Sequence, residues 1–493
     1  MARSDRHEVM MIGIDAGDID YIQASLGQLP NLRRLFSDGA LSRLRSPAEI
    51  MTASVWPTFY TGKLPGEHGY YFPMQWDPNT MRLRRVSADW LYCEPFWYEF
   101  ARQGLLVTAL DVQTAFPSRI PCGVEVINWG AQSFESLSSN RPELARDILR
   151  RFGKHPMGPD IPVRQSRGRL EAMRKDLLAG VRQRGDLCRW LLQQTEWRLF
   201  ITVFTEGHRA GHYFWPDPSP AVEVPENALV EVFQAIDKEI GSLVASVDMN
   251  DTVVILFAVH GMGPNDAQSH FVPEIMDRIN AAFAAEGRAG ARPARQRSPM
   301  RVLRESLPPG VQEFVARSVP EGVRDWVTSR AFGGGLAWDR TPGFAIPSGG
   351  EAFIRCNLAG REKEGMLPEG SELHRSYLER VKQGFLSLKV KGTDIPLVKE
   401  VVFPGDVYAG PRSHHLPDVA VVWNGLKPAK EIYSERLGAF SGQLATGRPG
   451  NHRADGFAVV VDRRSGATDP RRLDHIVDLA PFVRHLLTGS EPM

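Results

Sequence analysis

One segment organises the chain, and it reads Pro47-Ala-Glu-Ile-Met-Thr52-Ala-Ser-Val-Trp-Pro-Thr-Phe-Tyr-Thr61-Gly62-Lys63-Leu-Pro65-Gly66-Glu-His68-Gly69. It passes from small, strand-breaking residues into an aromatic run with helical spacing, which is typical of a sharp turn from a strand into a helix. Thr52 stands where that helix is expected to begin. A hydroxyl there loses its proton more readily, and an anion beside it is held, because free amide hydrogens and the positive end of the helix dipole face it. The segment therefore predicts a nucleophile turn, and a plain helix cap is the alternative.

The length and charge of the chain limit what this turn can belong to. With 493 residues, of which 42% are hydrophobic, the chain can bury a large core and forms either one large domain with an inserted lobe or two domains. Lys and Arg (59) balance Asp and Glu (58), which gives a formal net charge of +1. Without a basic field, binding to nucleic acid through its phosphates is not expected. A small anionic molecule is the expected partner.

The N-terminus and the cysteines indicate the compartment. Residues 1–8 are polar and lead into Val9-Met-Met-Ile-Gly-Ile, an apolar run too short for a secretory or membrane-spanning segment. The four cysteines show no C-x-x-C spacing, which fits buried thiols in a reducing compartment. We therefore expect a cytoplasmic protein without stable membrane insertion. The sequence carries no signal of oligomeric state, and a monomer or homodimer is the default expectation.

Short β-branched runs alternate with longer amphipathic ones along the first half of the chain. The predicted strands are Val9 to Asp15, Leu105 to Asp111, Val124 to Trp129, Arg198 to Thr205 and Thr252 to Val259, and the predicted helices include Leu29 to Ser37, Gly168 to Gln194 and Glu226 to Val247. This rhythm predicts an α/β fold with a central, mainly parallel sheet sandwiched by helices. Ligands of such sheets gather at the carboxyl ends of the strands, where Asp15, Glu206 to His212 and His260 fall.

The pattern breaks between residues 268 and 348, where Gly, Ala, Arg and Pro crowd together and short helical pieces follow. We interpret 268–348 as a mostly helical insertion or lid that divides an α/β core into 1–267 and 349–493, with a return to the sheet at Glu351. The apolar positions Val311, Phe314, Val315 and Val319 form either a packing face or a face that docks on a membrane.

Four histidines and one aspartate lie at these expected strand ends. His208-Arg-Ala-Gly-His212 puts two imidazoles on one face of a helical turn, the spacing by which one ion takes both nitrogens. His260 closes a strand, and His452 opens the loop before the last strand. Singly, such residues are structural more often than not. Together with Asp15 and the Thr52 hydroxyl they predict a metal-assisted nucleophilic site.

The order of these motifs resembles the alkaline phosphatase superfamily and, within it, the type I phosphodiesterase and nucleotide pyrophosphatase branch. The motifs are Gly13-Ile-Asp15, Thr52 with Tyr60-Thr-Gly62-x-x-Pro65-Gly66-x-His68-Gly69, His208-x-x-Gly-His212, His260-Gly261-Met262 and Gly450-x-His452. The resemblance implies an alkaline phosphatase-like fold, a two-zinc site and Thr52 as nucleophile. It also implies that Asp15, His260 and the Thr52 oxygen bind one ion, and that His212 and His452 bind the other.

The chain departs from the family pattern at three places. His208 and Val259 stand where the family has aspartates, and Pro73 falls where it has an asparagine that helps to bind the phosphoryl oxygens; Gln75 is a nearby amide that could replace it. With two carboxylates fewer, less negative charge offsets the repulsion between two dications. The ion at Asp15 and His260 is the one expected to be lost.

What remains is His208, His212 and His452, a set of the type that holds one tetrahedral zinc with an open position. Mn²⁺ or iron is possible instead. Asp266, Asn265 and Asp18 are candidate replacement oxygen ligands, and the sequence does not decide between them.

The leading hypothesis is a metal-dependent hydrolase of phosphoesters, of the phosphodiesterase or phosphatase type. Thr52 is its nucleophile, and the backbone amide after Thr52, together with Gln75, holds the oxyanion. Two alternatives stay open. One is a non-catalytic protein that binds an anionic ligand, for which Val259 is the best evidence; the other is a transferase or hydrolase of a non-phosphate bond that uses a single three-histidine zinc.

Overall fold

The central sheet has eight strands and is parallel in its middle. The computed structural model describes residues 8–113, 116–130, 136–217, 223–285, 309–332, 336–463 and 473–489. In sheet order the strands are β2 (Ala40–Leu44), β21 (Gly456–Val461), β9 (Thr252–Ala258), β1 (Glu8–Ile14), β8 (Leu199–Phe204), β5 (Val107–Leu110), β6 (Val124–Ile127) and β7 (Ser138–Ser139). The pairs from β9 to β6 are parallel, whereas β2, β21 and β7 pair antiparallel. The predicted α/β class is confirmed.

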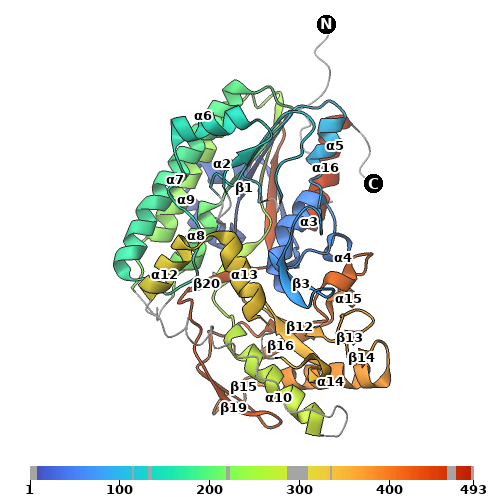
Figure 1. Ribbon diagram of the computed structural model, residues 1–493. Helices are drawn as coiled ribbons and strands as arrows, with labels where there is room; N and C mark the ends of the chain where they lie inside the picture. Colours follow the sequence, from blue (N-terminus) through green and yellow to red (C-terminus); the bar gives the residue numbers. More distant parts are fainter. Residues whose placement is uncertain are drawn as a thin grey trace.

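Helices cover both faces of this sheet, which explains the continuous apolar runs of its strands. Figure 1 shows the sheet between two helical layers. One layer contains α2 (Pro30–Asp38), α6 (Pro142–Phe152), α7 (Arg167–Gln194) and α9 (Ala228–Val244), and the other contains α3 (Val55–Thr61), α5 (Trp97–Arg102) and α16 (Leu479–Thr488). Along β1, Met10 and Ile12 belong to the core under the first layer, and Val9 and Met11 to the core under the second. Side chains of a strand alternate between its faces, so β1 is buried on both.

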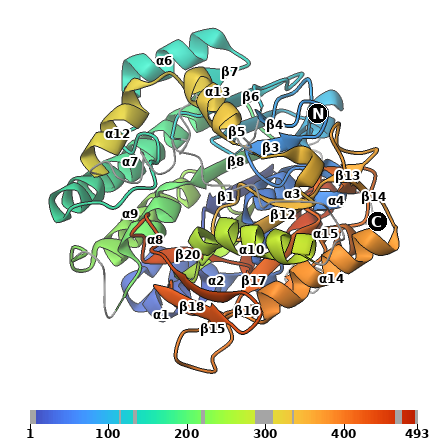
Figure 2. The ribbon, with the colours of Figure 1, turned by 60° about the horizontal axis from the view of Figure 1, so that its bottom comes forward.

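A second, smaller sheet forms the lower end of the molecule. Its antiparallel strands are β11 (Gly343–Ile346), β12 (Ala352–Cys356), β17 (Val419–Trp423) and β16 (Val398–Val402), in that order. Helices α10 (Val272–Ala285) and α14 (Glu372–Leu386) share its hydrophobic core, and Figure 2 shows them beside one another. A ribbon of β15 (Lys389–Val390), β18 (Glu431–Ser434) and β19 (Gly438–Ser441) extends this part.

This second sheet corrects one sequence-based expectation. The chain does not rejoin the main sheet at Glu351; the strand that follows Glu351 pairs within the second sheet, and the main sheet is rejoined only at Gly456–Val461. Local sequence does not specify a strand's partner, because the same apolar run is buried equally well in either sheet.

The predicted insertion is also only partly separate. Helix α10, inside the range 268–348, packs in the core of the second sheet. Helix α13 (Glu321–Ala331) lies against β4 (Arg82–Arg85), where Arg85 forms two hydrogen bonds to Asp325 at 2.5 and 2.9 Å. In α12 (Pro309–Ser318), Val311 and Val315 are exposed. Residues 286–308 lie outside the described residues, so the lid interpretation stays a prediction.

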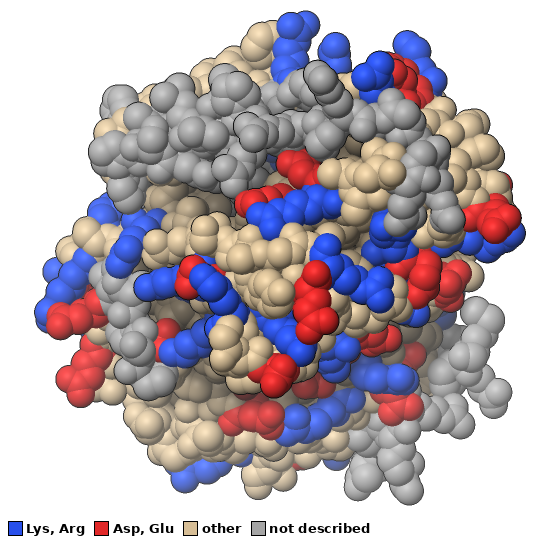
Figure 3. All heavy atoms as spheres, turned by 90° about the horizontal axis from the view of Figure 1, so that it is seen from below, with Lys and Arg blue, Asp and Glu red and all other residues tan. Residues whose placement is uncertain are grey.

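None of the described helices is long and apolar enough to cross a bilayer. The face of the molecule seen from below carries basic and acidic side chains side by side, without a dominant sign (Figure 3). This mixture agrees with the balanced composition of the chain.

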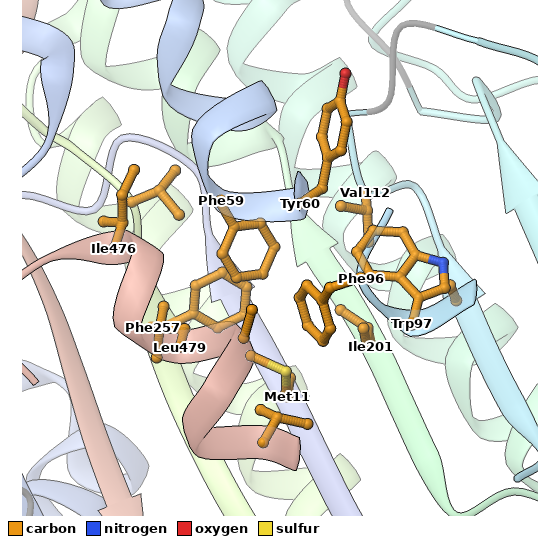
Figure 4. Close-up of a cluster of buried hydrophobic side chains, with 14 of the residues drawn as sticks. Met11, Phe59, Tyr60, Phe96, Trp97, Val112, Ile201, Phe257, Ile476 and Leu479 are labelled. Carbon is orange, nitrogen blue, oxygen red and sulfur yellow. The ribbon is translucent and has the colours of Figure 1, made fainter. Parts of the chain in front are cut away.

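The helix that carries the Thr52 turn is fixed to the sheet by aromatic packing. Phe59 of α3 stacks on Phe257 of β9 with ring centroids 4.9 Å apart and meets Phe96 edge-on at 6.0 Å (Figure 4).

Phe59→Ala is expected to lower the free energy of unfolding by about 3–5 kcal/mol, because the ring is fully buried and its removal leaves a cavity. Urea unfolding measures this loss. Leu149→Ala, at a 43% exposed position, is the control and should change stability by no more than about 0.5 kcal/mol; equal effects of the two changes would contradict the packing role.

His68 is a neutral structural histidine. Its Nδ1 accepts from the Tyr70 amide at 3.0 Å, and its Nε2 lies 3.1 Å from Thr58 Oγ1. Burial, and then the neighbouring Arg412, lower the pKa of His68 from 6.5 to about 3. As the pH falls below 6.5 the unfolded chain therefore takes up a proton before the folded protein does, so the stabilisation is complete above that pH and is lost towards pH 3.

Between pH 6.5 and about pH 3, the unfolding free energy of the parent protein should decrease as the pH is lowered. We expect this decrease to be steeper than that of His68→Gln. The difference in slope should approach about 1.4 kcal/mol per pH unit, the value for one proton. Urea unfolding at a series of pH values measures both slopes, and parallel curves would show that His68 does not titrate as described.

Candidate active site

Thr52 opens the turn that the sequence predicted. It is the first residue of a 3-10 turn, Thr52–Ser54, that runs directly into α3. Its amide donates to Glu351 Oε1 at 2.7 Å, and its Oγ1 donates to the carbonyl of Ala48 at 3.2 Å. Helix α3 ends at Gly62, whose φ of 64° is left-handed and suits glycine. The hydroxyl is therefore held at the start of a helix, with a carboxylate on its own amide.

Three imidazoles from distant parts of the chain meet at one point. His208 and His212 lie on one face of α8 (Glu206–Phe214), which starts immediately beyond β8, and His452 lies on β20 (Gly450–Arg453), which pairs with β10 (Gly261–Pro264). The Nε2 of His208 is 3.0 Å from Nε2 of His212 and 2.7 Å from Nε2 of His452. Ligand atoms of all three lie within 4.8 Å of one another.

The second nitrogen of two of these rings is engaged. His212 Nδ1 donates to the carbonyl of Gly450 at 2.9 Å, and His208 Nδ1 donates to Asp15 Oδ2 at 2.9 Å. A proton on Nδ1 leaves the lone pair on Nε2, as in metal-ligating histidines. Burial, and then nearby positive groups, lower the pKa of His212 and His452 well below the usual value, so both rings are neutral.

This geometry fits a tetrahedral divalent ion. Zinc–nitrogen bonds of about 2.0–2.1 Å place tetrahedral ligand atoms about 3.3 Å apart. The two Nε2 separations from His208, 3.0 and 2.7 Å, are somewhat shorter, so a bound ion requires the rings to move apart slightly. The three candidate donors are imidazole nitrogens, a ligand type that zinc prefers, and His452 lines an open cleft. Among the described residues this is the group of histidines, cysteines and carboxylates able to hold a metal ion.

Asp15 lies beside the cluster at the end of β1, fully buried. Its Oδ2 accepts from His208 Nδ1 and from Gln113 Nε2, and its Oδ1 accepts from Trp56 Nε1 at 3.1 Å and lies 3.3 Å from His260 Nε2. Burial would raise the pKa of Asp15, but His208 and His260 lower it, so the net pKa is far below its usual range and the group is a carboxylate. Nitrogens of His208, Gln113 and Trp56 thus donate to this carboxylate, and His260 Nε2 lies close to it.

His260 meets Asp15 rather than the Nε2 cluster. Its Nε2 faces Asp15, and its Nδ1 donates to the carbonyl of Gly261 at 3.0 Å. Its ring centroid is 4.9 Å from that of His452. The structure thus brings Asp15, His208, His212, His260 and His452 together, with Asp15 and His260 forming the inner layer.

The residues considered as replacement oxygen ligands bind neighbouring backbone or side-chain groups. Asn265 binds the loop before His452 twice: its amide nitrogen donates to the carbonyl of Pro449 and its Nδ2 to that of Arg448, both at 2.7 Å. Asp266 accepts from Asn451 Nδ2 at 3.0 Å. Asp18 caps α1 (Ile19–Ser25) by accepting from the Tyr21 amide at 2.8 Å.

Gln75 is placed away from the cleft. Its Oε1 accepts from the amides of Tyr71 and Phe72 at 2.8 and 3.4 Å, and its Nε2 donates to the carbonyl of Gly69 at 3.1 Å. These bonds stabilise the loop after His68, and the buried side chain is not among the residues that line the cleft. The oxyanion role that the sequence suggested for Gln75 therefore has no geometric support. Val259, which stands where the family has an aspartate, is likewise away from the cleft and is fully buried in the hydrophobic core.

A buried ionic network anchors the start of α8, and sequence reasoning missed most of it. Arg184 of α7 donates to Glu206 at 2.9 and 3.1 Å and to Asp111 at 2.9 Å, and His155 Nε2 lies 2.8 Å from Glu206. Burial raises the pKa of Glu206, but Arg184 and His155 lower it to about 2. Glu206 is two residues before His208, so the network fixes the helix that presents the imidazoles. Nothing in the pattern of α7 marks Arg184 as buried.

A cleft of about 470 Å³ lies between Thr52, the second sheet and β20. Its wall contains Thr52, His452, Glu49, Glu351, Lys399 and Asp455. Glu351 was not predicted, because a single acidic residue after Gly349-Gly350 carries no motif. The nucleophile candidate and one metal-ligand candidate therefore share one solvent-filled space.

Comparisons with known proteins show the family of the chain and structures with a similar fold. The family model for type I phosphodiesterase / nucleotide pyrophosphatase matches residues 9–330. Over 98% of this chain and 96% of theirs, the fold is similar to crystal structures of phosphonoacetate hydrolase from Sinorhizobium meliloti 1021, in complex with phosphonoformate (TM-score 0.53, 14% identity) and with phosphonoacetate (TM-score 0.51, 13% identity). A search of curated proteins found no match. Because the family model covers more than half of the sequence, the chain belongs to the type I phosphodiesterase / nucleotide pyrophosphatase family.

Proposed function

We propose that this protein is a metal-dependent hydrolase of phosphoesters, in which the Thr52 hydroxyl attacks phosphorus. The observation that carries the proposal is the convergence of three imidazoles, one of them from His452, which lines the cleft that also contains Thr52. Membership of a phosphodiesterase family supports the reaction class. The expected substrate is a small anionic ester. The cytoplasmic location of the protein stays a prediction.

His208, His212 and His452 would hold the ion, with zinc as the first candidate and Mn²⁺ or iron as others. Such an ion supplies Lewis-acid stabilisation of negative charge that develops on a phosphoryl or leaving oxygen. The chain prepares the ligands: Asp15 and the Gly450 carbonyl hold the protons of His208 and His212 on Nδ1, so that each Nε2 faces the ion.

Thr52 would form a bond from Oγ1 to phosphorus and lose its proton to solvent, while the bond from phosphorus to the ester oxygen breaks and that oxygen takes up a proton from solvent. Water would then hydrolyse the bond between phosphorus and Oγ1 and return the proton to Thr52. The hydroxyl is oriented beforehand by its bond to the Ala48 carbonyl, which must break when Thr52 attacks. The amide of Ala53, the residue after Thr52, remains our candidate for contact with the oxyanion.

A single ion is favoured over two. The Asp15 oxygens are already surrounded by four nitrogens, and Val259, where the family has a second carboxylate, lies in the core. A second ion at Asp15 and His260 would have to displace the hydrogen bond that orients His208. We therefore assign Asp15 to the orientation of a ligand.

Asp15→Asn should weaken zinc binding by about 10–100-fold without changing the number of ions bound, because it removes the partner of a ligand and not a ligand. Competition against a chromophoric chelator measures the affinity, and metal analysis gives the number. Asp18→Asn is the matched control, since Asp18 caps a helix three residues further on, and it should bind zinc as the parent does. A loss of one ion out of two in Asp15→Asn would instead make Asp15 a ligand.

Thr52→Ala should reduce turnover of an aryl phosphodiester by at least about a thousandfold with bound metal unchanged, whereas Thr52→Ser keeps a hydroxyl and retains measurable turnover. Initial rates and metal content of the purified variants check both expectations. Absence of turnover in the parent protein across diesters, monoesters and added metals would favour the anion-binding alternative over catalysis.

A further inference from the structure

Glu351 connects the second sheet to the Thr52 turn. It directly precedes β12, is 8% exposed, and reaches across 299 positions of sequence to accept from the Thr52 amide at 2.7 Å through Oε1. Its other oxygen, Oε2, accepts from the Gly350 amide at 2.9 Å. Both carboxylate oxygens are thus bound by backbone amides, one of them the amide of the proposed nucleophile.

The backbone around Glu351 holds this carboxylate in place. Trp423 Nε1 donates to the carbonyl of Gly350 at 2.9 Å, and Ser348 Oγ donates to the carbonyl of Glu351 at 2.6 Å. A Cβ at Gly350 would lie 2.9 Å from Asn451 Nδ2, so this turn packs closely against the strand that carries His452. The side chain is pre-positioned and does not need to move to reach Thr52.

Among the described residues no Lys or Arg pairs with Glu351, in contrast to Glu49 and Asp266 of the same cleft. Glu49 is 2.5 Å from Lys399 Nζ, and Asp266 accepts from Asn451 and from Arg453. For Glu351, the described residues provide backbone amides and no Lys or Arg within salt-bridge distance. A full negative charge therefore stands beside the Thr52 amide, where Coulomb repulsion acts on any anion that approaches the hydroxyl.

We propose that Glu351 is a specificity-determining residue that disfavours doubly charged phosphoryl groups. This inference rests on the proposed function of the same cleft. A phosphoryl oxygen that would accept from the Thr52 amide must compete with the carboxylate, and each negative charge on the ligand adds repulsion. The repulsion from Glu351 is therefore about twice as large for a doubly charged monoester or inorganic phosphate as for a singly charged diester.

The test measures binding, so it does not depend on turnover. Calorimetric titration at pH 8 compares inorganic phosphate, mostly doubly charged, with singly charged dimethyl phosphate in the metal-loaded full-length protein. Glu351→Gln removes the charge and keeps an oxygen for the Thr52 amide, and Glu351→Ala removes both. Asp455→Asn is the matched control, because it removes one charge from the same cleft without a described contact to Thr52.

Glu351→Gln is expected to bind phosphate about tenfold more tightly than the parent and dimethyl phosphate no more than about threefold more tightly, with metal content unchanged. Glu351→Ala should bind phosphate at least as tightly as Glu351→Gln, since the amide is then free. Asp455→Asn should change phosphate binding less than about twofold. If the alanine variant does not fold, the glutamine variant decides the question by itself.

The inference is overturned by unchanged phosphate affinity in Glu351→Gln, by an equal gain in Asp455→Asn, or by the absence of phosphate binding in every variant. A parent protein that binds these anions but turns over no ester would contradict the proposed function and leave the role of Glu351 in anion selection standing.

Discussion

The site depends on one buried carboxylate. Asp15 at the end of β1 has no solvent around it and is stabilised by nitrogens that come from separate elements. Trp56 comes from the helix that follows Thr52, His208 from α8, His260 from the end of β9, and Gln113 from beyond β5. An unpaired buried charge would be costly, so these elements must close around Asp15 together. The same contacts therefore fix the nucleophile turn relative to the imidazoles.

Most of the main sheet could be predicted from sequence because its strands are continuous apolar runs separated by long amphipathic helices. Val9–Asp15 and Thr252–Val259 were placed almost to the residue. The second sheet was not foreseen, since Ala352–Cys356 looks like any buried strand and its partner β17 lies more than sixty residues further on. Partner choice in that region is decided by packing with α10 and α14.

The imidazoles could be predicted because their spacing and motif order carry the signal, and the structure brings them together. Gln75 was suggested by proximity in sequence, but its amide is used by the backbone of its own loop. Arg184 and Glu351 escaped prediction for a common reason: a charged residue in a long polar helix or in a glycine turn shows its burial only after distant segments have packed around it.

The central claim is that three imidazoles hold one ion while Asp15 stays behind them. Anomalous diffraction at the zinc absorption edge, from crystals of the zinc-loaded protein, tests it most directly. We expect one anomalous peak, about 2.0–2.1 Å from the Nε2 atoms of His208, His212 and His452. A peak between Asp15 and His260, alone or as a second site, would contradict it.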